Sequence, residues 1–232
     1  MEQLGVGVIW YAVLLFSLTF HEAAHAWAAR RGGDDTAYLG GQVTLDPRPH
    51  VRREPFGMVI FPLLSYAISH SMLGWASTPF DPKWAHEHPR RAAAMSAAGP
   101  AANAALVLAA ALAIRAGMAA GVFHAPASIG FEHLVEANTD GVAATAALLL
   151  SVLFTLNLLL LIFNLIPFPP LDGASAVGLF FSDQGARRVQ ALLANPRLSL
   201  VGLLMAWILM PRIFGPIHRI AVNLLYPEFG YG

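Results

Sequence analysis

The chain has 232 residues, of which 56% are hydrophobic and only 12% are charged, and its formal net charge is +0. Soluble domains carry about 25% charged residues, so this composition excludes an ordinary water-soluble surface and indicates a membrane protein. No basic stripe points to a nucleic-acid partner, and the lack of cysteine excludes disulfides, thiolate metal sites and cysteine nucleophiles.

Four apolar segments are long enough to cross a bilayer as helices. We expect these helices at residues 4–29, 91–118, 142–166 and 198–225. No basic residue precedes the first segment, so we interpret it as a retained helix and not as a cleaved signal peptide. The predicted fold is an all-α polytopic membrane protein. We expect a single domain over 1–232, with its core motifs in 20–173 and a C-terminal helix at 198–225.

The connection between the first two helices contains two further elements. Residues 38–45, "YLGGQVTL", combine β-type residues with a glycine pair and predict a short strand or hairpin. Residues 58–75 are apolar but interrupted by Pro62, His70 and Gly74. They form either a fifth crossing or a re-entrant segment, since broken backbone at membrane depth must be covered by protein.

Basic residues predict the orientation of the helices. The second connection, residues 119–141, has no lysine or arginine, whereas the third has Arg187, Arg188 and Arg197. The first connection is the richest, with Arg30, Arg31, Arg48, Arg52, Arg53, Lys83, Arg90 and Arg91. The positive-inside rule therefore places the first and third connections in the cytoplasm. Because this holds only if residues 58–75 return to the side they entered, we favour the re-entrant interpretation.

The first apolar segment ends in "FHEAAHA", which places two histidines and a glutamate at membrane depth. His21 and His25 lie four residues apart and share one helix face, and a glutamate directly after the first histidine can reach a metal-bound water. The alternative is a helix end whose polar residues have reached the headgroups. Arg30 and Arg31 mark the interface, however, and His25 lies about 7 Å inside it. Ionisable groups at that depth are usually functional, which favours a zinc site with Glu22 as general base.

A catalytic zinc needs a third protein ligand and an open position. The candidates in this sequence are Asp46, His50, His70, Glu132, Glu136, Asp140 and Asp172. The last follows the third helix in "FNLIPFPPLDG", where the prolines must end the helix. Because the first and third helices run in the same direction, Asp172 arrives at the same membrane face as His21 and His25. Topology therefore selects Asp172.

Three motifs occur in the order seen in the site-2 protease family of intramembrane zinc metalloproteases: "FHEAAHAWAARRGGD", "AAGPAAN" and "FNLIPFPPLDG". The chain resembles the compact prokaryotic branch, in which the helix with the zinc motif comes first. "TLDPRPH" and "GWASTPFDP" also resemble the connecting region of that branch. The resemblance implies that His21, His25 and Asp172 bind zinc, that Glu22 is catalytic, and that Asn103 and Asn164 lie near the active site.

The resemblance further implies one zinc ion per chain and a protease of the cell membrane that cuts within or near transmembrane segments of other proteins. The orientation predicted from the basic residues places its active site toward the cytoplasm. Asn103 and Asn164 have two interpretations: hydrogen bonds between helices, or donors to the oxyanion formed at the scissile carbonyl. Asn157 is interpreted as a link between helices. A strand at residues 41–45 would pair with an unwound substrate by β-addition.

Two other functions remain open from the residues alone. One is a non-enzymatic membrane protein that binds or transports a metal, since buried histidines and aspartates also mark ion pathways. Glu22 argues against it, because a transport site does not require a carboxylate directly after the first histidine. The other is a zinc hydrolase that acts on a small or lipid-linked substrate.

Overall fold

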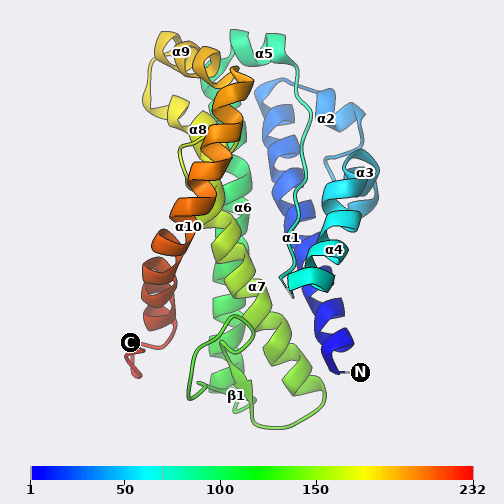
Figure 1. The fold of residues 1–232 in the computed structure, drawn as a ribbon, viewed down its shortest axis with the longest axis vertical. Helices are drawn as coiled ribbons and strands as arrows, with labels where there is room; N and C mark the ends of the chain where they lie inside the picture. The colour runs from blue at the N-terminus through cyan, green and yellow to red at the C-terminus, as the bar shows by residue number, and fades with distance from the viewer. Residues whose placement is uncertain (1, 70, 232) are drawn as a thin grey trace.

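The computed structural model describes residues 2–69 and 71–231. Four long helices dominate this part of the chain: α1 (Glu2–Gly32), α6 (Pro89–Ala119), α7 (Val142–Leu165) and α10 (Pro196–Leu225). Each is long and apolar enough to cross a membrane, and they run lengthwise through the molecule in Figure 1. The structure confirms the predicted all-α polytopic fold and places the helices within a few residues of the predicted bounds.

Helices α1, α6 and α7 form the interior of the bundle, whereas α10 lies at its margin. Trp10 and Leu14 of α1 pack in one buried cluster with Val152 and Leu156 of α7. In the most apolar 18-residue stretch of α10, only 11% is buried within the protein, whereas the share for the corresponding stretch of α7 is 56%. Most of the apolar surface of α10 therefore faces outward, where the acyl chains of a bilayer would cover it.

The end of α7 is set by proline. Pro167 lies two residues after the last helical residue, Leu165, and cannot continue the helix. The chain then turns back through α8 (Asp172–Ala176), η2 (Val177–Phe180) and α9 (Asp183–Leu193) before α10 begins. The turn is tight, because a Cβ atom on Gly173 would lie 2.4 Å from the carbonyl oxygen of Leu165. Glycine after Asp172 therefore lets α8 start directly beneath the end of α7.

The predicted strand at residues 38–45 is wrong. Its first two residues belong to α2 (Thr36–Leu39), and residues 40–45 form turns and bends. The Asp34 side chain accepts hydrogen bonds from both the backbone N–H and the hydroxyl of Thr36. The backbone N–H of Gln42 donates to the Ala37 carbonyl. These local bonds close a helical turn at each end and outweigh the β-propensity of the side chains.

The strands that the structure does describe lie between α6 and α7. They are β1 (Phe123–His124) and β2 (Glu136–Ala137), which pair antiparallel. This small hairpin sits at the opposite end of the bundle from α5 and α9 (Figure 1).

The connection between α1 and α6 continues through five further elements: α3 (Pro47–Arg53), η1 (Phe56–Ile60), α4 (Phe61–Ser69), an extended segment at residues 71–81, and α5 (Pro82–Glu87). The apolar helical stretch η1–α4 is too short to cross a bilayer, which takes about 20 residues.

The extended segment returns to the end of the bundle from which η1 departs. The Ser77 hydroxyl donates to Glu54 at 2.5 Å and lies 3.3 Å from the Arg53 Nε that donates to it. The Asp81 amide donates to Asp34, just beyond the end of α1. The segment therefore enters and leaves at one end of the bundle, which is the path that the re-entrant interpretation requires. His70 lies outside the described residues.

Candidate active site

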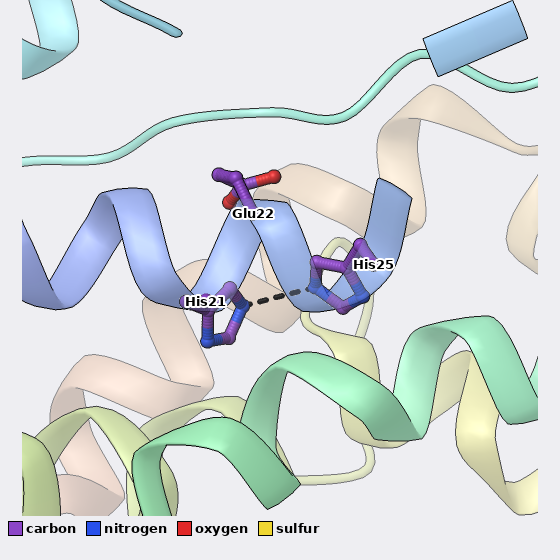
Figure 2. A group of neighbouring side chains, drawn as sticks. All are labelled: His21, Glu22 and His25. Carbon is purple, nitrogen blue, oxygen red and sulfur yellow. Dashed lines mark hydrogen bonds between the residues drawn. The ribbon is translucent and has the colours of Figure 1, made fainter. Parts of the chain in front are cut away.

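Two imidazoles and one carboxylate converge between α1, α6 and the start of α8. His21 and His25 lie on the face of α1 that points toward α6 (Figure 2), and their Nε2 atoms are 3.0 Å apart. Asp172 Oδ2 lies 3.0 Å from His21 Nε2 and 3.2 Å from His25 Nε2. Three potential ligand atoms from segments far apart in the sequence thus meet at one point.

The tautomer of His25 follows from its other ring nitrogen. Nδ1 lies 2.7 Å from the carbonyl oxygen of Met95 on α6. A carbonyl only accepts hydrogen bonds, so Nδ1 carries the proton and donates it. In neutral His25, Nε2 is therefore left with a free lone pair that points at the cluster.

A chain of amide side chains sets the tautomer of His21 in the same way. Asn157 Nδ2 donates to the Leu153 carbonyl at 2.8 Å, so Asn157 Oδ1 must accept from Asn103 Nδ2 at 2.9 Å. Asn103 Oδ1 is then the acceptor for His21 Nδ1 at 2.6 Å. His21 also presents an unprotonated Nε2 to the cluster.

These donor atoms fit a zinc ion. Two Nε2 lone pairs and a carboxylate oxygen crowded within 3.2 Å repel one another unless a cation lies between them. Nitrogen and oxygen ligands about 2.0–2.2 Å from a tetrahedral zinc lie about 3.3–3.5 Å apart, close to the observed spacing. Asp172 would bind such an ion as the ionised carboxylate, which is the form in which a carboxyl group ligates a metal.

Glu22 lies beside the cluster but faces another way. Its side chain points toward the extended segment, on the side of α1 away from the two imidazoles (Figure 2). Its carboxylate accepts a hydrogen bond from Thr78 Oγ1 at 2.7 Å, and one oxygen lies within 4.8 Å of a ring nitrogen of each histidine. Glu22 is only 4% exposed. The Glu22 carboxylate therefore lies within reach of a group held at the two histidines, while Thr78 binds one of its oxygens.

Thr78 is a site residue that the sequence analysis missed. It belongs to the segment "GWASTPFDP", and its hydroxyl also lies 3.0 Å from the Glu22 carbonyl oxygen. The only signal in the sequence was the resemblance of this segment to the connecting region of the family. Nothing in its pattern indicates that Thr78 contacts Glu22.

Gly99 allows α6 to approach the cluster. A Cβ atom at this position would lie 2.4 Å from the Nε2 atoms of both His21 and His25, far inside van der Waals contact. The residue belongs to the motif "AAGPAAN", in which Asn103 follows on the same helix face. The motif thus combines a gap for the ligands with the amide that orients one of them.

We expect Gly99→Ala to weaken zinc binding by about 10–100-fold, because the new methyl group displaces the imidazoles from their common point. Helix α6 itself should tolerate alanine, which is the better helix former. Zinc affinity, measured by competition with a chelator, tests this. Gly215→Ala on α10 is the matched control, since a Cβ atom there meets nothing within 4 Å. Equal zinc affinity in wild type and Gly99→Ala would contradict the expectation.

A cavity of about 610 Å³ connects the cluster with one end of the bundle. His25, Asp172 and Thr78 line it near the cluster, and residues of α5, α6, α8 and α9 form its other walls. Helices α5 and α9 lie together at the upper end in Figure 1. The cavity has the size of a typical ligand pocket and gives water and a peptide a route to the buried ligands.

The other candidate ligands are engaged elsewhere. Asp46 caps α3 by accepting from the Arg48 amide, and the buried His50 lies 3.1 Å from the Thr44 carbonyl through its Nε2. Neither side chain belongs to the cluster of ligand atoms.

The acidic residues between α6 and α7 lie at the opposite end of the bundle. Glu132 accepts a hydrogen bond from Trp10, which precedes His21 by about 16 Å along α1. Glu136 pairs with His124 of the hairpin, and Asp140 is exposed. The structure therefore brings only Asp172, among the described candidates, to the two histidines.

The asparagines behave differently from one another. Asn103 is fully buried and uses its carbonyl for His21 and an amide hydrogen for Asn157, so its contacts support a link between helices that also orients a ligand. Asn157 donates as well to Ser17 of α1. Asn164 is half-buried near the end of α7 and makes no side-chain hydrogen bond within the described part of the chain. Its role as an oxyanion donor stays a prediction.

The fold and the cluster together define a class: a multi-pass membrane protein in which two buried histidines and an aspartate meet at one point, with a second carboxylate beside them. Residues 9–209 match peptidase family M50, and the chain belongs to this family. The resemblance found in the motifs is therefore confirmed.

The chain is similar to two curated proteins that are named as putative zinc metalloproteases. The chain is 35% identical over 168 residues to "Putative zinc metalloprotease YwhC" of Bacillus subtilis (strain 168), covering 69% of this chain and 63% of the relative. It is 32% identical over 173 residues to "Putative zinc metalloprotease Rip2" of Mycobacterium tuberculosis, covering 75% of this chain and 57% of the relative. The chain thus spans less than two thirds of the length of either relative. No solved structure matches it.

Proposed function

We propose that this protein is an intramembrane zinc metalloprotease that hydrolyses peptide bonds within or near the transmembrane segments of other membrane proteins. The observation that carries the proposal is the convergence of His21, His25 and Asp172 within 3.2 Å, next to the buried carboxylate of Glu22 on a membrane-spanning helix. Membership of a peptidase family and the names of the relatives support it.

The roles of the residues follow from their positions. His21, His25 and Asp172 would hold the zinc, which when bound supplies a Lewis acid and lowers the pKa of a water molecule. Glu22 takes a proton from the attacking water at its carboxylate and returns it to the nitrogen of the leaving amine. Thr78 holds one Glu22 oxygen through its hydroxyl, which keeps the carboxylate beside the ligands. Asn103 and the Met95 carbonyl keep both imidazoles in the ligand tautomer.

A transmembrane substrate must unwind before it is cut, because a helix hides its carbonyl groups in its own hydrogen bonds. The strand predicted at residues 41–45 is not formed and cannot receive the unwound chain. The extended segment at residues 71–81 runs along α1 past Glu22 and takes its place in the proposal. An unwound substrate would lie beside this segment by β-addition.

The non-enzymatic alternative, a metal-binding or transport protein, gains no support from the family or from the relatives' names. A proteome comparison separates it from the proposal. Cells that express the wild-type protein should contain membrane-protein fragments whose new termini lie in or beside transmembrane segments. Cells that express Glu22→Gln should lack them. Identical fragment sets from the two strains would refute proteolysis.

The proposed orientation in the cell membrane places the ends of α5 and α9, and hence the mouth of the cavity, in the cytoplasm. The basic residues support it, because most of them lie in the two connections at this end, whereas residues 119–141 have none. The exceptions, Arg115, Arg212 and Arg219, lie within α6 and α10. The chain has no cysteine, so a single introduced cysteine would be the only thiol that a labelling reagent can modify. Gln184→Cys on α9 and Thr139→Cys before α7 are both exposed positions.

We expect an impermeant thiol reagent to label Thr139→Cys in intact cells and Gln184→Cys only after permeabilisation. The unmodified chain is the blank, and each variant must first be shown to be present in the membrane. Labelling of both cysteines from the same side would overturn the proposed topology.

A further inference from the structure

The wall of the cavity that α9 forms carries one positive charge, on Arg187. Among the described residues that line the cavity, Arg187 is the only lysine or arginine, and the ligand Asp172 is the only carboxylate. Most of the remaining lining residues are alanine, proline or other small or apolar residues, with His25 and His86 as titratable exceptions. A peptide bound in this cavity therefore meets one permanent cation away from the metal site.

Arg187 has no partner of its own in the described part of the chain. It is half-buried, makes no hydrogen bond and forms no ion pair, even with Asp183 four residues earlier on the same helix. Helix α9 is held in place by Gln190, which donates to the Ala85 carbonyl of α5 at 3.0 Å. A guanidinium that lies beside a cavity and lacks an anionic partner among the described residues is well suited to bind a carboxylate through two parallel hydrogen bonds.

We propose that Arg187 selects substrates by an acidic residue, an aspartate or glutamate that occupies the α9 side of the cavity while the scissile bond lies at the metal ligands. This inference rests on the proposed function and names the class of substrate: a transmembrane segment with a carboxylate in one flank. A lysine or arginine at the same position would be repelled by Arg187, so the cavity discriminates by the sign of the charge.

The neighbouring Arg188 provides the matched control. It is exposed and does not line the cavity, although it belongs to the same helix and the same basic stretch. Arginines near a membrane surface also attract anionic lipid headgroups. An effect of general surface charge or of lipid would therefore involve Arg188 as much as Arg187, whereas recognition within the cavity involves Arg187 alone.

The test measures binding with the full-length Glu22→Gln protein, so that no peptide is cut. The protein is held in a neutral detergent at about 0.15 M salt, where charges more than about 8 Å apart are screened. The probes are fluorescent transmembrane peptides with one common apolar segment and a flank of three aspartates, three asparagines or three lysines. One set carries the flank at the N-terminal end and a second set at the C-terminal end. Anisotropy titration gives each Kd.

In one of the two sets, the aspartate peptide should bind about 10-fold more tightly than the lysine peptide, as expected for a close charge pair at a partly buried site. Arg187→Gln should remove this preference and Arg187→Glu should reverse it, whereas Arg188→Glu should leave it unchanged. Zinc content and helical circular dichroism establish that each variant is folded.

Equal binding of the three peptides in both sets would overturn the inference. An effect of Arg188→Glu as large as that of Arg187→Glu would overturn it too, and so would loss of the preference when vesicles of an anionic phospholipid are added, because Arg187 would then be a lipid contact. The readout does not depend on cleavage. A charge preference without any proteolysis would therefore contradict the proposed function alone, and proteolysis without a charge preference would contradict only the role of Arg187.

Discussion

Glu22→Gln is expected to lower the rate of peptide cleavage by about 10²–10⁴-fold while the protein keeps its zinc, because an amide cannot accept the proton of the attacking water. The substitution is otherwise mild. The new side chain has the same shape, and its carbonyl oxygen can still accept the hydrogen bond from Thr78 that the carboxylate now accepts.

The measurement combines the cleavage rate of a substrate found in the proteome comparison with metal analysis of the purified protein. Glu87→Gln is the matched control, since Glu87 is an exposed residue of α5 at a distance of 4.0 Å from Lys83. It should cleave at the wild-type rate. A near-normal rate in Glu22→Gln would show that Glu22 is not the general base. Loss of zinc from this variant would instead make Glu22 a ligand.

The second large effect concerns the metal. We expect the wild-type protein to hold about one zinc ion per chain and the double variant His25→Ala, Asp172→Ala to hold none. The double change removes two of the three lone pairs that meet within 3.2 Å and leaves only His21, which cannot retain zinc alone. Metal analysis after dialysis against a competing chelator gives the stoichiometry.

A pair of the same chemical kind serves as control. His124 and Glu136 lie 3.2 Å apart in the exposed hairpin at the opposite end of the bundle, and their double replacement by alanine should not change the zinc content. Circular dichroism should confirm that the helices persist in both double variants. Full zinc retention in His25→Ala, Asp172→Ala would refute the proposed ligand set.

The membrane-spanning helices could be predicted from the sequence because their signal is local. A run of about 20 apolar residues must bury its backbone polar groups in a helix when it enters hydrocarbon, whatever its neighbours do. The strand at residues 38–45 failed for the opposite reason. The preference of its side chains for a sheet is weak, and the hydrogen bonds of Asp34 and Gln42 to the ends of α2 decided the local structure.

The metal site lies between these two cases. The four-residue spacing of His21 and His25 fixes a common helix face in any environment, and the direction of the helices then predicted that Asp172 would arrive nearby. The structure brings the three side chains together within 3.2 Å. The contacts of Asn103 could not be predicted in this way. Its partners His21 and Asn157 lie 82 and 54 residues away in the chain, so the sequence did not indicate which groups its amide binds.

The sequence by itself therefore determined the class of protein, its long helices, the paired histidines and the family, since each depends on composition, on helical period or on short motifs. Only the tertiary structure decided which groups surround these residues. Thr78 reaches Glu22 across 56 positions, and Gly99 leaves room for two imidazoles on another helix. Arg187 lies in the wall of the cavity without a partner among the described residues. Such contacts arise from the packing of distant segments, and no periodicity along the chain encodes them.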